Sequence, residues 1–127
     1  METKSNKFSI MSVEYKKPLL SKNDIKADLK VKQGGQITLI NDDENNHRIQ
    51  IDVTLTVTIL GQFSKKEAPM IELKTRSEYD VDKEPNDQDL ETYIVDAVFE
   101  ARKALKEITI TFNIKPIDLV DNPVKIK

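Results

Sequence analysis

The chain contains no cysteine, only three glycines and a single histidine. Without cysteine it can form no disulfide, no thiolate metal site and no cysteine nucleophile. It also lacks an excess of either charge, because 20 basic residues face 22 acidic ones and leave a net charge of −2. Such a balance gives no long-range attraction to phosphate backbones or anionic lipid. We therefore expect neither nucleic acid nor a membrane surface as a partner.

Long apolar runs are missing as well. No stretch approaches the length of a membrane span, and the start METKSNKFSIMS has no signal-peptide hydrophobic region. A cytoplasmic location is the resulting expectation. The length of 127 residues is enough for one domain, residues 1–127, around one hydrophobic core.

Signals for catalysis are scarce. The histidine, His47, stands at a loop end, and the sequence places no nucleophile or orienting acid with it. No phosphate-binding glycine loop, nucleophile elbow or zinc signature is present. The acidic stretch 42–44 has oxygen ligands for a hard cation, although acids in a hairpin loop are usually just solvated. We therefore predict no enzyme activity and no cofactor.

One acidic segment has the spacing of a calcium loop. Asp80, Asp82, Glu84 and Glu91 stand at positions one, three, five and twelve of an EF-hand pattern. Position six needs glycine for a sharp turn, and Pro85 stands there. The segment before it also has a strand pattern instead of an entering helix. We therefore predict no metal site.

The clearest pattern in the chain is an alternation over residues 49–59. Apolar residues take every second position there, and a period of two places them all on one face of a strand. A strand with one apolar and one polar face belongs to an antiparallel sheet covered on one side. The apolar positions are Ile49, Ile51, Val53, Leu55, Val57 and Ile59.

Three further segments have strand patterns. Residues 8–15 change parity near Met11, which predicts a bulge or bend. Residues 25–33 alternate between apolar and polar residues, with lysines facing outward. Gly34 and Gly35 then predict a turn or bulge. Residues 36–40 either prolong the strand after it or form another strand. Residues 70–81 alternate again. Four strands joined by short loops predict an antiparallel meander.

The period changes after Pro85. Apolar residues then follow helical spacing from Leu90 to Leu105, with acidic residues at the start and basic residues near residue 106, which predicts a helix over residues 87–107. From Ile108 to Ile114 the alternation returns, so we expect a strand there. The predicted fold class is α+β, with one long amphipathic helix packed on one face of a sheet of four or more strands.

Two helical residues lie off the core face. Val95 and Phe99 are one turn apart on the side opposite Leu90 and Ala101. A domain with one sheet cannot bury both sides of its helix. These residues therefore pack on a subunit partner, form part of a binding surface, or are scattered surface hydrophobes.

The order of these segments resembles the SecB-like superfamily of bacterial export chaperones. The matching stretches are FSIMSVEY, IKADLKV, HRIQIDVTLTVTI, MIELKTRSEYDV and the helix DLETYIVDAVFEARKAL. The resemblance implies a diverged SecB-like protein that holds unfolded or partly folded polypeptide in apolar grooves, assembles as a dimer or tetramer and uses no cofactor. After the helix the chain continues as ITITFNI, where SecB has a crossover and a second helix.

Three functions remain as hypotheses. The first is a SecB-like chaperone or polypeptide-binding module, and the second is an oligomeric structural or regulatory protein that binds one folded partner through Val95 and Phe99. The third is a ligand-binding or metal-dependent enzyme, for which only the acidic loops argue. Five large aromatic residues are candidates to line a groove for polypeptide: Tyr15, Phe63, Tyr79, Tyr93 and Phe112. Aromatic residues at strand or helix spacing more often belong to a core.

Overall fold

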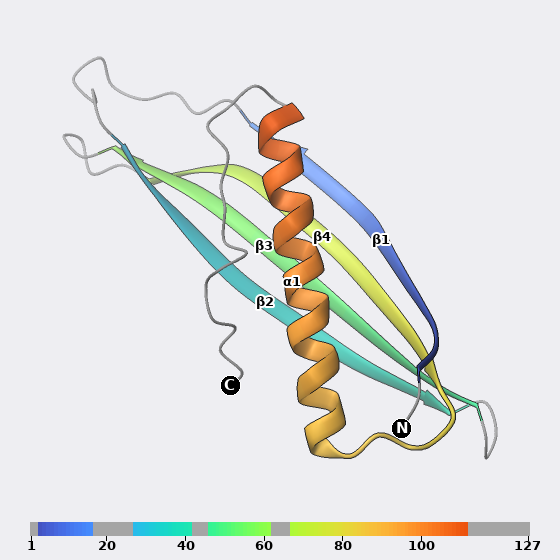
Figure 1. The fold of residues 1–127 in the computed structure, drawn as a ribbon. Helices are drawn as coiled ribbons and strands as arrows, with labels where there is room; N and C mark the ends of the chain where they lie inside the picture. The colour runs from blue at the N-terminus through green and yellow to red at the C-terminus, as the bar shows by residue number, and fades with distance from the viewer. Residues whose placement is uncertain (1–2, 17–26, 42–45, 62–66, 112–127) are drawn as a thin grey trace.

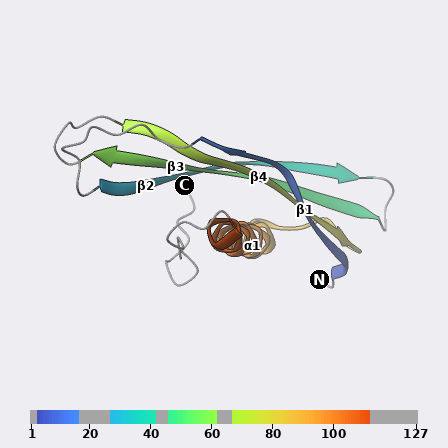
Figure 2. The same cartoon turned by 90° about the horizontal axis from the view of Figure 1, so that it is seen from above.

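A four-stranded sheet carries one long helix on one face. The computed structural model describes residues 3–16, 27–41, 46–61 and 67–111. The elements are β1 (Thr3–Tyr15), β2 (Ala27–Asn41), β3 (His47–Gly61), β4 (Glu67–Val81) and α1 (Asp87–Thr111). Figures 1 and 2 show α1 lying across one side of the sheet and leaving the other side uncovered by any helix of the described residues. The predicted fold class is confirmed.

The strands lie in the order β1-β4-β3-β2, and every neighbouring pair is antiparallel. The meander therefore runs through β2, β3 and β4, and β1 joins it beside β4. The two strands with the most complete apolar alternation, β3 and β4, occupy the centre, where a covered face excludes most water. β1 and β2 form the two edges.

The core lies between α1 and the two central strands. The predicted face of β3 is confirmed, since its alternate residues from Ile49 to Val57 are all at most 2% exposed. Burying one such side chain is worth about 1.5–3 kcal/mol. Three alanines let the helix approach the sheet closely. The main residues that meet these β3 side chains are Ile71, Leu73, Tyr79 and Val81 of β4 and Ala97, Val98, Ala101, Ala104 and Leu105 of α1.

The two edge strands differ from each other in regularity. The predicted bulge near Met11 is confirmed, because the β1–β4 register shifts between Ile10 and Ser12. The predicted turn or bulge at Gly34 and Gly35 is wrong, because β2 pairs with β3 without interruption over its full length. Gly35 is instead a site of close approach, where a Cβ atom would lie 3.0 Å from the backbone oxygen of Asp52.

The helix is longer at its C-terminal end than predicted. It continues to Thr111, so the strand expected from Ile108 is wrong for residues 108–111, while residues 112–114 lie outside the described residues. Ile108 packs against the core, and the buried Thr109 hydroxyl donates to the Lys106 carbonyl oxygen at 2.7 Å. These contacts outweigh the strand preference of β-branched residues. As a result the last turn carries no basic residue.

Candidate functional site

Exposed apolar side chains gather on the side of the sheet that carries α1. Cross-strand partners in an antiparallel ladder share a face, so the register assigns each edge residue to one side of the sheet. Five exposed edge residues pair with buried core positions and therefore face the helix side; we call them the apolar border. They are Ile10, Val13 and Tyr15 of β1, which pair with Thr75, Leu73 and Ile71, and Ile37 and Leu39 of β2, which pair with Ile51 and Ile49.

The bulge in β1 makes this arrangement possible. A regular strand would place Ile10 and Val13 on opposite faces, because they are an odd number of residues apart. The shift at Met11 restores Val13 to the same side as Ile10. Met11 itself is 52% exposed, and Ile10 is 49% exposed. The bulge therefore keeps a row of apolar side chains on the helix side of an edge strand.

The helix covers only the middle of this side. α1 packs mainly on β3 and β4, which leaves the border residues of β1 and β2 exposed by 36–49%. This limited coverage has a simple cause: one helix is about 10 Å wide, whereas four strands span roughly 14 Å between the outer strand axes, with side chains beyond.

The predicted surface residues of the helix are exposed. Val95 is 41% exposed and Phe99 is 37% exposed, and we call this pair the α1 ridge. The Lys103 ammonium lies 5.3 Å from the centroid of the Phe99 ring and 3.5 Å from a Glu100 carboxylate oxygen. The ridge therefore has an apolar centre with a charged neighbour, as protein interfaces commonly do.

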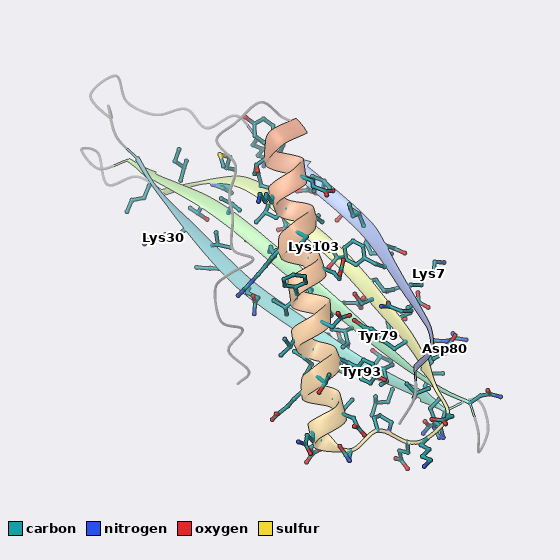
Figure 3. All side chains as sticks on the ribbon, in the orientation of Figure 1. Lys7, Lys30, Tyr79, Asp80, Tyr93 and Lys103 are labelled. Atoms are coloured by element: carbon teal, nitrogen blue, oxygen red, sulfur yellow. The ribbon has the colours of Figure 1, made fainter. Side chains whose placement is uncertain are left out.

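Two of the five predicted groove residues belong to the core. Tyr79 and Tyr93 are 2% and 8% exposed and pack between β4 and α1, with ring centroids 4.5 Å apart (Figure 3). Neither is available as a groove lining. Tyr15 is exposed at the end of β1, while Phe63 and Phe112 lie outside the described residues.

Tyr79 ties the helix to the sheet by a polar contact. Its hydroxyl donates to Asp96 Oδ2 at 2.5 Å. Burial raises the pKa of this hydroxyl above its ordinary value of 10.0, and the hydrogen bond to Asp96 raises it further. The tyrosine is therefore a neutral donor at neutral pH and serves the fold, with no sign of use as a base.

A second polar contact joins the helix to the edge strand β2. Arg102 Nη2 donates to Gln33 Oε1 at 2.9 Å, and Arg102 is only 8% exposed. Burial lowers the pKa of its guanidinium. By helix angle Arg102 lies on the same side of α1 as Val95, although Arg102 is buried and Val95 is exposed.

The acidic segment after β4 forms a helix cap. Asn86 Oδ1 accepts a hydrogen bond from the Asp89 backbone at 2.8 Å, and Asp89 Oδ2 accepts one from the Asn86 backbone at 3.1 Å. This reciprocal pair is a capping box.

Within the described ranges no three His, Cys, Asp or Glu residues cluster so as to hold a metal ion. His47 Nδ1 lies 2.7 Å from Asn41 Oδ1 across the β2–β3 pair, and residues 42–45 lie outside the described residues.

The opposite side of the sheet is polar. Arg76 Nε donates to Asp52 Oδ1 at 2.8 Å, and this bond is the main reason that the pKa of Arg76 is raised. Arg48 lies 3.4 Å from Asp80. Both pairs join the central strands on the face away from α1, where threonines fill most of the remaining positions of β3.

The sequence alone does not predict the apolar border. The alternation of β1 and β2 was visible, but it did not show which strands lie at the edges. Exposure of Ile10, Val13, Ile37 and Leu39 follows from the strand order together with the width of a single helix. The α1 ridge, in contrast, was readable from helix angles.

Comparisons with known proteins support the fold. No protein-family model matches the chain, and no curated protein sequence matches it. The structure is similar to that of the SecB-like chaperone Rv1957 of Mycobacterium tuberculosis in complex with a ChAD peptide from the Rv1956 HigA1 antitoxin. The TM-score is 0.59 at 9% identity, over 99% of this chain and 90% of that one. The chain therefore has a SecB-like fold.

No helix in the described part of the chain combines the length and apolar content needed to cross a membrane.

Proposed function

We propose that this protein binds unfolded or partly folded polypeptide as a SecB-like chaperone, without catalysis and without a cofactor. The observation that carries the proposal is the placement of exposed apolar side chains. The five border residues and the two ridge residues all stand on the side that bears α1. An apolar surface held open by a rigid sheet suits extended, apolar chain segments.

The structural neighbour supports the same class of partner. Rv1957 is a SecB-like chaperone seen in complex with a peptide from another protein. A protein partner is therefore favoured over a small molecule. We place the activity in the cytoplasm and propose a role in protein transport or in protein quality control.

The α1 ridge contributes a second proposal. Val95 and Phe99 form an assembly contact in a homo-oligomer, a dimer or tetramer, because an exposed phenylalanine next to charged residues is suited to an interface. The alternative function uses the same ridge: an oligomeric structural or regulatory protein that docks one folded partner there. The exposure of Phe99 is the observation that favours this alternative.

An aggregation-suppression assay separates the two functions. A chemically unfolded test protein is diluted into buffer with the wild-type chain and without nucleotide, and light scattering is followed. The chaperone proposal expects scattering to fall in proportion to the added chain. Scattering that is unchanged at a several-fold molar excess would remove the chaperone proposal and leave the folded-partner alternative.

A further inference from the structure

One buried hydroxyl on the helix side of the sheet lacks a hydrogen-bond partner. Thr75 of β4 is 1% exposed, and its Oγ1 atom forms no hydrogen bond with any of the described residues. Thr109 of α1 is buried to the same degree, but its hydroxyl donates to the Lys106 carbonyl oxygen at 2.7 Å. Most buried polar side-chain atoms are satisfied as in Thr109. Thr75 is therefore an exception that requires an explanation.

The fold alone gives no reason for a hydroxyl at this position. A polar group that loses its water without gaining another partner destabilises the folded state. Valine has the shape of threonine with a methyl group in place of the hydroxyl, and it is equally suited to a strand. Val53, directly opposite Thr75 on β3, is such a residue and is 2% exposed. Packing would therefore favour valine at position 75.

Thr75 lies at the boundary between the core and the apolar border. β4 separates β3 from the edge strand β1 (Figure 1), and in the register Thr75 stands between Val53 of β3 and Ile10 of β1. The Ile10 side chain is 49% exposed. Directly opposite side chains on neighbouring strands begin about 4.5–5.5 Å apart. The hydroxyl is therefore within one strand spacing of surface that a bound polypeptide can contact.

The edge strand is irregular at the same point. Ile10 pairs with Thr75 and Ser12 with Lys74, so the β1 bulge follows immediately after the residue that stands opposite Thr75. A bulge bends a strand and interrupts its hydrogen-bond ladder, and bulges are common beside functional sites. The unpaired hydroxyl and the bulge are independent observations that meet at one place on the helix side of the sheet.

We propose that the Thr75 hydroxyl hydrogen-bonds to the backbone of a polypeptide segment bound on the apolar border of β1. This inference rests on the proposed function and adds a residue to its binding site. The bound segment displaces the half-exposed Ile10 side chain and takes its place over Thr75. A hydroxyl can donate to a carbonyl oxygen or accept from an N–H group, and every polypeptide carries both groups whatever its sequence. Thr75 thus provides a contact that is independent of client sequence.

Two substitutions at Thr75 separate this role from a structural one. Thr75→Val keeps the shape and removes the hydroxyl, whereas Thr75→Ser keeps the hydroxyl and removes a buried methyl group. Thr54→Val, on the opposite face of the sheet, is the matched control. The probe is fluorescently labelled, reduced and carboxymethylated α-lactalbumin, which stays unfolded. Its binding is measured by anisotropy, and thermal melting of each variant is followed by circular dichroism.

Stability and affinity should change in opposite directions. Thr75→Val should raise the melting temperature by about 3–6 °C and raise the dissociation constant for the probe about three- to tenfold. Thr75→Ser should melt below wild type, because buried apolar volume is lost, and still bind within about twofold of wild type. Thr54→Val should also bind within about twofold. A residue that served only the fold would not produce this crossed pattern.

Two results overturn the role of Thr75. One is a Thr75→Val variant that binds the probe as tightly as wild type, and the other is a Thr75→Ser variant that binds as weakly as Thr75→Val. If wild type binds the probe and Thr75→Val binds it equally well, the proposed function stands and this inference fails. If wild type does not bind the probe, both fail.

Discussion

The two faces of the sheet are built from the same four strands and differ in how their side chains are satisfied. On the face away from α1, polar side chains pair with each other, as Arg76 does with Asp52 at 2.8 Å. On the face toward α1, aliphatic side chains depend on a covering element, and one helix covers only the central strands. The sheet therefore has more apolar surface than α1 covers. That excess is the physical basis for the proposed function.

The largest effect is expected where the helix does cover the sheet. Val53→Asp or Leu55→Asp places a carboxylate at a position exposed by 2% or less, with no cationic partner provided. The free energy of unfolding should fall by at least about 4 kcal/mol, enough to unfold many domains of this size. Denaturant titration followed by circular dichroism measures it.

The matched controls for this prediction are on the opposite face of the same strand. Thr54→Asp and Thr56→Asp are expected to cost about 1 kcal/mol, because these positions are partly solvated. If all four variants unfold at the same denaturant concentration, the assignment of the two faces of β3 is wrong.

Tyr79 provides the next test on the covered face. Tyr79→Phe removes the donor to Asp96 and leaves a part-buried carboxylate short of one hydrogen bond, so stability should fall by about 1.5–3 kcal/mol at pH 7. Asp96→Asn with Tyr79→Phe serves as the control, since an amide in place of the carboxylate removes the unpaired charge. A double variant that loses the sum of both single effects would indicate that the two side chains are not coupled.

The same tyrosine sets a pH dependence with a defined sign. The folded state raises the pKa of Tyr79 above 10.0, so the folded chain keeps a proton that the unfolded chain releases. This contribution to stability is fully present below pH 10 and is lost as the pH rises beyond that value toward the folded-state pKa. Wild type should therefore lose more stability above pH 10 than Tyr79→Phe does. Parallel losses in both proteins would contradict the raised pKa.

Smaller effects are expected at the glycines of β2. Gly35→Ala introduces a Cβ atom 3.0 Å from the Asp52 backbone oxygen, whereas Gly34→Ala meets nothing within 4 Å. We expect Gly35→Ala to destabilise the fold by about 1 kcal/mol and Gly34→Ala to be neutral or stabilising by a few tenths, because alanine reduces the entropy of the unfolded chain. Thermal melting of the two variants decides this, and an inverted order would show that β2 can shift without cost.

The smallest effect on stability is expected on the α1 ridge. Phe99→Glu should change the free energy of unfolding by under about 0.5 kcal/mol, because the side chain is 37% exposed. It should nevertheless reduce self-association in sedimentation experiments if the ridge is an assembly contact. A variant that assembles as well as wild type would refute that role for Val95 and Phe99.

Much of the fold was predictable because its signals are local. The alternation of residues 49–59 and 70–81 defined the covered faces of β3 and β4, and the parity change at Met11 predicted the bulge. The end of α1 was not predictable, because the ITIT sequence at residues 108–111 suits a strand and a helix alike, and tertiary packing of Ile108 and Thr109 decided between them. The outcome at Gly34 and Gly35 was not predictable either, because a glycine pair is equally typical of a bulge and of a close approach between backbones.

The candidate site was less predictable because it depends on long-range pairing. β1 is next to β4, far from it in sequence, and no local pattern specifies that neighbour. Without the strand order, Ile10 and Leu39 are simply alternate residues of two strands. Tyr79 and Tyr93 were candidates for a groove by size alone, but they face each other across the helix–sheet interface and belong to the core.

Client binding by variants of the two faces tests whether the apolar border binds unfolded polypeptide. Val13→Ser with Leu39→Ser removes apolar surface from the border of both edge strands, and Lys7→Ser with Glu14→Ser changes the opposite face of β1. Binding of a fluorescently labelled, permanently unfolded protein is measured by anisotropy, after melting curves show that both variants are folded. We expect the border variant to raise the dissociation constant about tenfold or more, because apolar area is lost, and the other variant to change it by under about twofold. Equal binding by the two variants, or a stronger loss in the Lys7 and Glu14 variant, would show that the apolar border does not bind the client.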